Sequence, residues 1–298
     1  MSTKRRLTLP SQSGIYPGSL AGTVGTWDIP LGYRYHQIDI IYIDGTGSPT
    51  DVRSLLGDVI VYRNGISERT HSALELDHLN NINGTGYGVQ QVGAGAAMRQ
   101  TLPIFFAEPW RKDKLDTDYM AWSVDANNGF KTFQIKMTLL ATFPATGSLI
   151  AMARVDAPIA PPKGSAQSVK KVYRVQIPAS GVSNDVTTLD ERDAYQTLLL
   201  KHPTGAYIQN VTLKNGGVLI LDNQNQQDNV ADLVNLGLNP ATSQTPGAFG
   251  FDIILDADDP LNSALPVNTA TAPWLKLTYS AAASGNVIAL VERLGPLD

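Results

Sequence analysis

Apolar and polar residues alternate along short segments through most of the chain. The segment HQIDIIYID (His36–Asp44) alternates and is rich in β-branched residues, and Phe130–Leu140 and Val169–Ile177 follow the same period of two. This pattern predicts β-strands with one face turned to a core. Further strands are predicted at residues 59–62, 102–106, 119–124, 195–201, 211–214, 218–221, 249–255, 274–280 and 286–294.

Only two segments change to a helical period. In His71–Ile82 the apolar residues recur at helical spacing, and Ser67 or Thr70 is available as the N-cap. Asp228–Leu236 shows a similar apolar stripe. The sequence therefore predicts one short helix in each half of the chain.

The two halves repeat one order of elements, namely a strand, a turn with Asn-Gly, a short helix, and an apolar strand that ends in acidic residues and proline. Pro109 and Pro260 end the two copies and lie about half of the 298-residue chain apart. The repeat indicates a tandem duplication. The first copy comprises VIVYRNG (Val59–Gly65), HSALELDHLNNI (His71–Ile82) and LPIFFAEPW (Leu102–Trp110), and the second VTLKNGG (Val211–Gly217), DNVADLVNLGL (Asp228–Leu238) and FGFDIILDADDP (Phe249–Pro260).

The element pattern predicts an all-β protein made of two tandem eight-stranded jelly-roll sandwiches, each with one short helix. A chain of 298 residues exceeds what one hydrophobic core usually supports, which agrees with two domains. We predict an extended N-terminal arm at residues 1–26, a first jelly roll at 27–156, a proline-rich linker at 157–165 and a second jelly roll at 166–298.

Composition narrows the function. Charged residues make up 17% of the chain, below the usual quarter, which suggests that much of the exterior meets other protein. The net charge of −4 argues against general nucleic-acid binding. With no cysteine, disulfides and thiolate sites are excluded. The N-terminus lacks a signal-peptide apolar region, and no apolar run approaches the roughly 18 residues of a transmembrane helix, so we expect synthesis in a cytoplasm.

No catalytic motif is evident. The four histidines (His36, His71, His78 and His202) do not show the spacing of a helical metal site, and structural or surface roles are expected for them. We predict that the protein is not an enzyme and needs no cofactor.

The carboxylates leave alternatives open, because β-sandwiches also host glycosidases. Glu108 ends one apolar strand, and Asp256, Asp258 and Asp259 end the matching one. Solvated loop acids are the favoured interpretation. A weak structural calcium site at Asp256, Asp258 and Asp259 and a pair of active-site acids are the alternatives.

Basic and aromatic residues gather at two places. Lys4, Arg5 and Arg6 form a basic cluster within the arm, which is either a disordered tail or a segment ordered by neighbours or by an anionic surface. Trp110 precedes Arg111 and Lys112, and this segment is either a solvated turn or an interaction edge.

Three segments of the first half carry a resemblance to a known family. They are IPLGYRYHQIDIIY (Ile29–Tyr42), VIVYRNGISERTHSALELDHLN (Val59–Asn80) and LPIFFAEPW (Leu102–Trp110). These segments resemble those of the double jelly-roll major capsid proteins of tailless icosahedral membrane-containing phages, nearest to corticovirus-like members of the lineage that also holds tectiviruses and adenoviruses. In the second half the resemblance is mainly architectural, and the chain lacks the long tower loops of larger members.

The resemblance implies a major capsid protein that is made in the host cytoplasm and located in the virion. It implies a homotrimer forming a pseudo-hexagonal capsomer, and an icosahedral shell over an internal lipid membrane. The implied partners are neighbouring capsomers, penton proteins and minor capsid proteins, with no specific nucleic-acid sequence. Lys4, Arg5 and Arg6 would then face inward, against lipid headgroups or genome phosphates.

Two other classes stay open. A carbohydrate-binding double β-sandwich, such as a lectin or receptor-binding protein, would need exposed aromatic rings beside polar loops, for instance near Trp110 or Trp274. A β-sandwich glycosidase or a bicupin is the third class, but a bicupin would need clustered histidine and glutamate ligands in each sandwich. The four histidines are scattered, which disfavours it.

Overall fold

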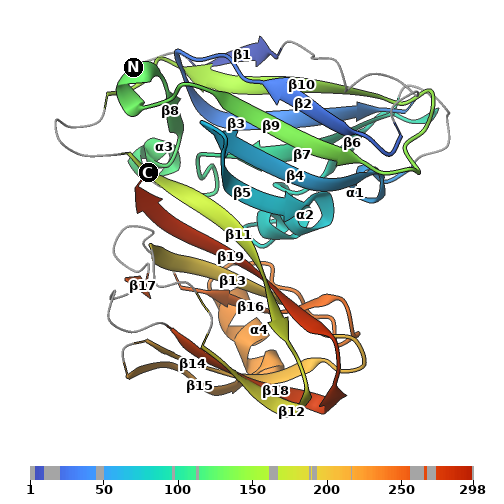
Figure 1. The fold of residues 1–298 in the computed structure, drawn as a ribbon, viewed down its shortest axis with the longest axis vertical. Coiled ribbons are helices and arrows are strands. Elements are labelled where there is room, and N and C mark those ends of the chain that lie inside the picture. Colours follow the sequence, from blue (N-terminus) through green and yellow to red (C-terminus); the bar gives the residue numbers. More distant parts are fainter. Residues whose placement is uncertain are drawn as a thin grey trace. The chain divides into compact units, whose positions relative to one another are not determined.

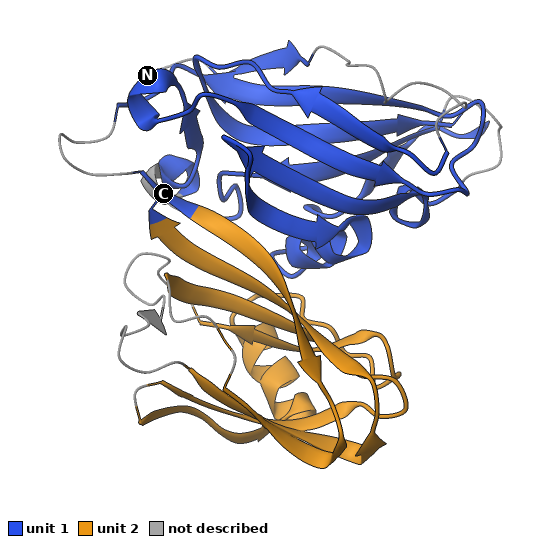
Figure 2. Ribbon diagram, viewed as in Figure 1, with its two compact units in different colours: residues 1–169, 296–298 blue, residues 170–295 orange. Residues whose placement is uncertain are grey.

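The computed structural model describes residues 4–9, 21–44, 50–95, 98–111, 114–160, 167–187, 189, 193–215, 217–255, 265–266 and 273–296. The chain divides into two compact units (Figure 2). Unit 1 comprises Met1–Val169 with Pro296–Asp298, and unit 2 comprises Lys170–Gly295.

Unit 1 is a sandwich of two antiparallel sheets (Figure 1). One six-stranded sheet has the order β1-β10-β3-β7-β6, with β8 paired to β3. In the other, β5 pairs with β4, β4 with β9, and β9 with β2. The strands are β1 (Arg5–Thr8), β2 (Val24–Asp28), β3 (Tyr33–Ile43), β4 (Leu56–Arg63), β5 (Ile66–Ser72), β6 (Gln90–Val92), β7 (Arg99–Phe105), β8 (Trp122–Val124), β9 (Phe133–Leu139) and β10 (Ser148–Asp156).

Unit 2 is a second sandwich with the same strand order. One of its sheets contains β16-β13-β19-β11, with β17 paired to β13, and the other is β12-β18-β14-β15. Its strands are β11 (Ser168–Pro178), β12 (Gly181–Val186), β13 (Ala194–Lys201), β14 (Ile208–Asn215), β15 (Val218–Asn225), β16 (Phe249–Ile254), β17 (Leu265–Pro266), β18 (Trp274–Ala283) and β19 (Asn286–Pro296).

Both units therefore share one topology. If β6, β8 and β17 are set aside, the described residues of each unit form eight strands, and one sheet takes the first, eighth, third and sixth of them. The other sheet takes the second, seventh, fourth and fifth. This is the jelly-roll arrangement, so the prediction of an all-β chain with two tandem jelly rolls is confirmed.

The helices confirm the repeat and correct its details. The helix α2 (Ala73–Asn81) follows β5, and α4 (Gln226–Asn235) follows β15, so each lies between the fifth and sixth strands of its jelly roll. Unit 1 also holds α1 (Val52–Leu55), α3 (Lys114–Tyr119) and the 3-10 turn η2 (Ala126–Asn128). The prediction of a single helix in the first half is therefore wrong, because helices this short leave almost no periodic pattern.

The N-cap predicted for the first helix is also wrong. Ser67 and Thr70 belong to strand β5, which pairs with β4 after the tight turn at Asn64 and Gly65. Both turn residues have positive φ angles (51° and 83°), as the Asn-Gly signal predicts. The true N-cap is Ser72.

The described parts of the predicted arm (residues 4–9 and 21–26) belong to the first jelly roll, and residues 1–3 and 10–20 lie outside the described part of the chain. Arg5–Thr8 forms β1, the first strand of jelly roll 1, and pairs with β10 in the register Arg5↔Val155. Leu9 is buried in the core, and Val24–Asp28 forms β2. The first jelly roll therefore begins near Arg5 and not at residue 27. A four-residue strand whose partner lies some 150 residues away has no local signal.

The predicted linker at residues 157–165 is only partly described. Residues 157–160 have no regular structure, and residues 161–166 lie outside the described part. The division between the units falls after Val169, which is the second residue of strand β11.

The two cores differ in composition. The core of unit 1 is rich in aromatic rings, including Trp122, whose ring centroid lies 5.0 Å from that of Phe106 and 5.8 Å from that of Phe133. The core of unit 2 is mainly aliphatic, with Tyr195, Phe251 and Tyr279 among leucines, valines and alanines. Each large apolar side chain buried in this way contributes roughly 1.5–3 kcal/mol.

Candidate functional site

In the basic N-terminal segment, Arg5 and Arg6 lie on strand β1 and Lys4 directly precedes it, and the ion pairs of Lys4 and Arg6 are within unit 1. Lys4 Nζ lies 2.7 Å from Asp118 Oδ1, at the end of α3, and Arg6 Nη2 lies 3.8 Å from Asp39 Oδ2 on β3. The Arg6 side chain is still 61% exposed, and Arg5 is exposed as well. Of the three predicted contact residues, Arg5 and Arg6 thus keep their charge at the surface, whereas Lys4 helps to close the fold.

Asp118 connects Lys4 to a buried charge cluster. His36 lies between two carboxylates, with Nδ1 3.2 Å from Asp118 Oδ1 and Nε2 3.1 Å from Asp156 Oδ1. Arg34 donates a hydrogen bond to the backbone carbonyl of Asp118 and lies 3.9 Å from Asp156. The cluster ties together β1, β3, α3 and β10.

The pKa values in this cluster follow from burial and charge. Burial lowers the pKa of His36, although the neighbouring Asp156 and Asp118 carboxylates oppose that shift. Burial tends to raise the pKa of Asp118, but the hydrogen bond from Lys4 and the charges of His36, Lys4 and Arg34 hold it below its usual value. The arrangement suits a structural clasp, since each charge has a partner within the same unit.

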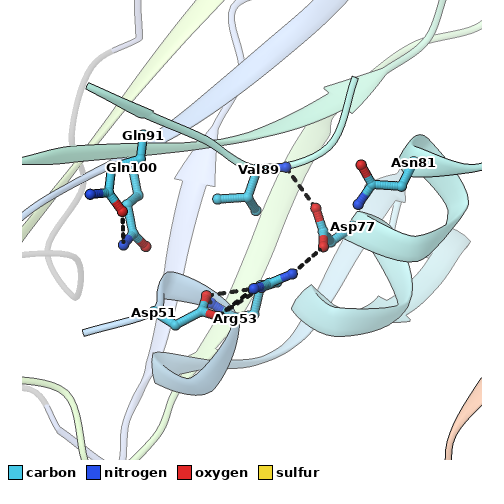
Figure 3. A pocket seen from close by; sticks show the side chains of 7 residues that line it. All are labelled: Asp51, Arg53, Asp77, Asn81, Val89, Gln91 and Gln100. Carbon is cyan, nitrogen blue, oxygen red and sulfur yellow. Dashed lines mark hydrogen bonds and ion pairs between the residues drawn. The ribbon is translucent and has the colours of Figure 1, made fainter. Parts of the chain in front are cut away.

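A cavity of about 290 Å³ opens in unit 1, between α1, α2 and the β6–β7 edge of the larger sheet (Figure 3). Asp51 caps α1, and Arg53 spans from it to α2, with Nη2 2.6 Å from Asp51 Oδ2 and Nη1 2.7 Å from Asp77 Oδ2. The other lining residues are Asn81, Val89, Gln91 and Gln100. Although burial opposes it, hydrogen bonds from Arg53 hold the pKa of Asp51 below its usual value.

No local pattern in the sequence predicts this cavity. Its residues come from segments 49 positions apart, from Asp51 to Gln100, and none belongs to a recognisable motif. The only detectable hint is Asp51 ahead of an apolar residue, which is the pattern of a helix N-cap.

The predicted acidic site is not assembled from described residues. Asp256, Asp258 and Asp259 lie outside the described part of the chain, so the calcium site stays a prediction. Glu108 is buried, and its Oε2 lies 3.2 Å from Arg111 Nε, which is the geometry of a structural ion pair. Within the described residues, no three histidine or acidic side chains gather in a way that could hold a metal ion.

The histidines are structural where their contacts are known. His202 is buried, accepts a hydrogen bond at Nδ1 from the Ile208 backbone N–H (2.9 Å) and lies with Nε2 2.8 Å from the Ser243 carbonyl. His71 is fully buried as well. These placements agree with the structural roles predicted from spacing.

The tryptophans proposed as sugar platforms are half-buried. Trp110 packs edge-on against Tyr87 and Phe105, with ring centroids 5.4 Å and 5.6 Å away. Trp274 carries the Lys214 ammonium group 5.0 Å from its ring centroid. Neither ring is the open platform that the carbohydrate-binding hypothesis required.

The described helices include none that is long and apolar enough to span a membrane.

Comparison with known proteins gives a clear result for structure alone. No family model matches the sequence, and no curated protein matches it either. Among solved structures, the chain is similar to the major capsid protein P2 from bacteriophage PM2, with a TM-score of 0.77 and 18% identity over 99% of this chain and 98% of that chain.

Two further structures share the fold at lower identity. One is from the atomic structure of Sulfolobus turreted icosahedral virus, with a TM-score of 0.65 and 12% identity over 98% of this chain and 90% of that one. The other is the faustovirus major capsid protein, with a TM-score of 0.60 and 7% identity over 99% and 90%. The chain therefore has the double jelly-roll fold found in capsid proteins, which confirms the fold implied by the resemblance.

Proposed function

We propose that this chain is the major capsid protein of an icosahedral virus and acts within the virion. The observation that carries the proposal is that the similarity to capsid proteins runs through both jelly rolls in series, across nearly the whole of both chains. A single jelly roll hosts many functions, so one matching domain would say little. Two in tandem, joined in the same order, are a far narrower match.

We further propose that three copies form the capsomer. Each chain carries two sandwiches of one topology, so a trimer presents six similar bodies and approximates a hexagon. Such a unit can tile a shell while using one gene product. Its partners would be neighbouring capsomers, together with penton and minor capsid proteins.

Exposed apolar side chains on unit 2 support association with other copies. Val218 and Leu219 on β15 are 63% and 45% exposed, and Val234 and Leu236 at the end of α4 are 55% and 50% exposed. Exposed apolar side chains occur on both units, and those on unit 2 include the last residues of α4. Exposed apolar patches are typical of interaction surfaces. We propose that the end of α4 contacts the next copy in the capsomer.

The mass of the purified protein in solution tests the capsomer. One chain has a mass of 32.0 kDa, so light scattering or native mass spectrometry should give three times that value. A strict monomer that never forms larger particles in electron micrographs would contradict the capsid proposal. Val234→Asp should shift the mass toward the monomer, because it buries a charge in the contact.

Leu74→Asp is the matched control, because Leu74 is a 47%-exposed apolar residue on the equivalent helix α2. We expect it to leave the mass unchanged. If Val234→Asp also leaves a trimer intact, the place proposed for the contact is wrong while the capsomer itself stands.

We also propose that the N-terminal segment faces an anionic surface such as an internal membrane. The exposed guanidinium groups of Arg5 and Arg6 support this, and each basic group near such a surface contributes about 1 kcal/mol. Flotation with vesicles containing anionic lipid should recover the wild-type protein and less of the Arg5→Ala, Arg6→Ala double variant. Equal recovery of both, or equal binding to neutral vesicles, would contradict the proposal.

A further inference from the structure

The cavity between α1, α2 and strands β6 and β7 has an open mouth and a buried polar floor. Arg53 and Asp51 lie at the mouth, with side chains 38% and 43% exposed, and Gln91 is exposed there too. Asp77 and Gln100 form the floor, at 3% and 5% exposure. Figure 3 shows these side chains around one common space, and they come from α1 and its N-cap, α2, β6 and β7.

Two of the lining side chains are held in place by hydrogen bonds from backbone N–H groups. Asp77 Oδ1 accepts from the Val89 backbone N–H (2.6 Å), which fixes the loop before β6 against α2. Gln100 Oε1 accepts from the Val52 backbone N–H (2.6 Å), which fixes the floor against α1. A ligand that enters therefore meets side chains whose positions are already set, and little entropy is lost in ordering them.

Hydrogen-bonding capacity remains inside the cavity. A guanidinium group has five N–H donors, and the hydrogen bonds of Arg53 to Asp51 and Asp77 use Nε and one hydrogen on each terminal nitrogen. Two donors are thus left on Arg53. The Gln100 amide reaches Gln91 Oε1 only at 3.3 Å, and the Gln91 amide nitrogen has no partner among the residues that the structure describes.

The chemistry of the lining selects the class of ligand. A cation would meet Arg53, and an anion would meet both Asp51 and Asp77, so either charge is opposed. An apolar molecule would touch a single apolar side chain, Val89. Acceptors and donors lie side by side, which suits a molecule that carries several hydroxyl groups, each both donor and acceptor.

The size narrows the ligand further. Drug-sized ligands occupy pockets of roughly 300–1,000 Å³, and this cavity lies at the lower limit. We propose that the cavity binds one uncharged sugar ring, either a free pyranose or a single residue of a glycan. The proposal stands on the cavity alone and holds whether or not the chain forms capsomers.

The test is saturation-transfer NMR on the full-length protein in its natural assembly state. The ligands are methyl glycosides of glucose, galactose and mannose, N-acetylglucosamine, and glycerol as a non-ring polyol. We expect saturation transfer to at least one pyranoside, with a dissociation constant on the order of 1 mM, and none to glycerol. An oligosaccharide that ends in the same sugar distinguishes the two sources. If it binds as well as the monosaccharide, the cavity accepts a residue of a glycan, and if it does not bind, the ligand is the free monosaccharide.

Two variants locate the binding. Gln91→Ala removes an exposed amide at the mouth and should weaken binding about fivefold. Arg53→Lys keeps the charge but loses the planar fork, and a loss of about tenfold or more is expected. Gln227→Ala, the same substitution at an exposed position of α4, should leave binding unchanged.

Three results would overturn the inference. They are no transfer to any pyranoside, binding that Gln91→Ala and Arg53→Lys leave unaltered, or saturation by calcium or inorganic phosphate in place of sugar. Thermal unfolding of each variant checks its fold, and Gln91→Ala stays decisive if Arg53→Lys proves unstable. Failure here with a trimeric mass would leave the capsid proposal untouched.

Discussion

The helix between the fifth and sixth strands is attached differently in the two jelly rolls. In unit 1, α2 buries six of its nine residues, among them Ala73, Leu76 and Leu79. In unit 2, α4 buries only three of ten, and two of those are the amides Gln226 and Asn229. The same topological position is thus filled once by a helix that buries three apolar and three polar side chains, and once by a helix that buries a single apolar side chain, Leu233.

Both helices use a side-chain amide to bind the sixth strand. Asn80 Nδ2 donates to the Pro103 carbonyl on β7 (2.8 Å), and Asn229 Nδ2 donates to the Asp252 carbonyl on β16 (2.7 Å). Gln226 adds bonds to the Gly250 and Ser243 carbonyls. Such bonds need little apolar contact, so α4 can keep Val234 and Leu236 at the surface. The comparison shows that the helix at this position can contribute to the hydrophobic core in one jelly roll and leave apolar side chains exposed at the surface in the other.

The largest expected difference in stability between variants of the two helices comes from removing a buried apolar side chain. Leu76 is 1% exposed and lies in the core of unit 1, so Leu76→Ala should lower the free energy of unfolding by about 2–5 kcal/mol. Leu233→Ala in α4 should cost less, since Leu233 is outside the clustered core of unit 2. Urea denaturation measures both. Leu74→Ala, exposed on the same helix, is the control, and equal losses for Leu76 and Leu233 would contradict the distinction.

Removing the side-chain amide that binds the sixth strand should have the opposite order of effects, with α4 destabilised more than α2. Asn229→Ala leaves the buried Asp252 carbonyl without its partner and should lower the free energy of unfolding by about 1–3 kcal/mol. Asn80→Ala removes the equivalent bond, but α2 retains its apolar contacts, so its effect on local opening should be smaller. Hydrogen exchange of the helix amides reports this. If the α2 amides exchange faster in Asn80→Ala than the α4 amides do in Asn229→Ala, the Asn229 amide is not what holds α4 in place.

Acid should act on the two halves through different histidines. Burial lowers the pKa of His202 below 6.5. The unfolded chain then binds more protons as the pH falls, so the stability present above about pH 6.5 is lost as the pH drops through the folded-state pKa. Protonation would also set Nδ1 against the Ile208 N–H. His36 has carboxylates on both sides that accept the charge, so its contribution should be smaller.

The measurement is the free energy of unfolding between pH 7.5 and 5 for the wild type, His202→Asn and His36→Asn. The loss of stability on acidification should shrink more in His202→Asn than in His36→Asn. A pH profile that His202→Asn does not flatten would show that His202 does not control it.

The N-caps should give the smallest effects and should be alike. In α2, Ser72 and Glu75 form a capping box, with Glu75 N bonded to Ser72 Oγ at 3.2 Å. In α4, Asn225 accepts from Asp228 N at 2.8 Å. Ser72→Ala and Asn225→Ala should each cost about 1 kcal/mol. Ser72→Asn is the control and should restore most of the loss, whereas a loss in only one helix would show that the two caps are not equivalent.

The sequence predicted most of the strands and missed several. Some of these have a distant partner, whereas β5 pairs with the adjacent β4 but is nearly all polar. Segments such as 130–140 and 286–294 show a clear apolar period and became β9 and β19. The predicted strand at 119–124 is only Trp122–Val124, because Lys114–Tyr119 is helical. The strands that were not predicted are β1, β2, β5, β6, β10, β12 and β17. Of these, β12 is mostly exposed, with no alternation to detect.

The candidate sites divide in the same way. Lys4, Arg5 and Arg6 were found as a basic cluster, but the pairing of Lys4 with Asp118 depends on a contact 114 residues away. The cavity at Arg53 was not predicted, since its lining comes from two helices, a loop and two strands. Ordinary residues gain a joint role there only through their placement.

The sequence by itself determined the all-β class, the duplication, the tight turn at Asn64 and Gly65 and the two principal helices. Each of these features depends on residues that are close together in the chain. Only the tertiary structure decided that Arg5–Thr8 is the first strand of a jelly roll, that α4 keeps an exposed apolar end, and that Asp51, Arg53 and Asp77 line one cavity. These features depend on pairing and packing between segments far apart in the chain, and no local pattern encodes which distant partner a strand or side chain will meet.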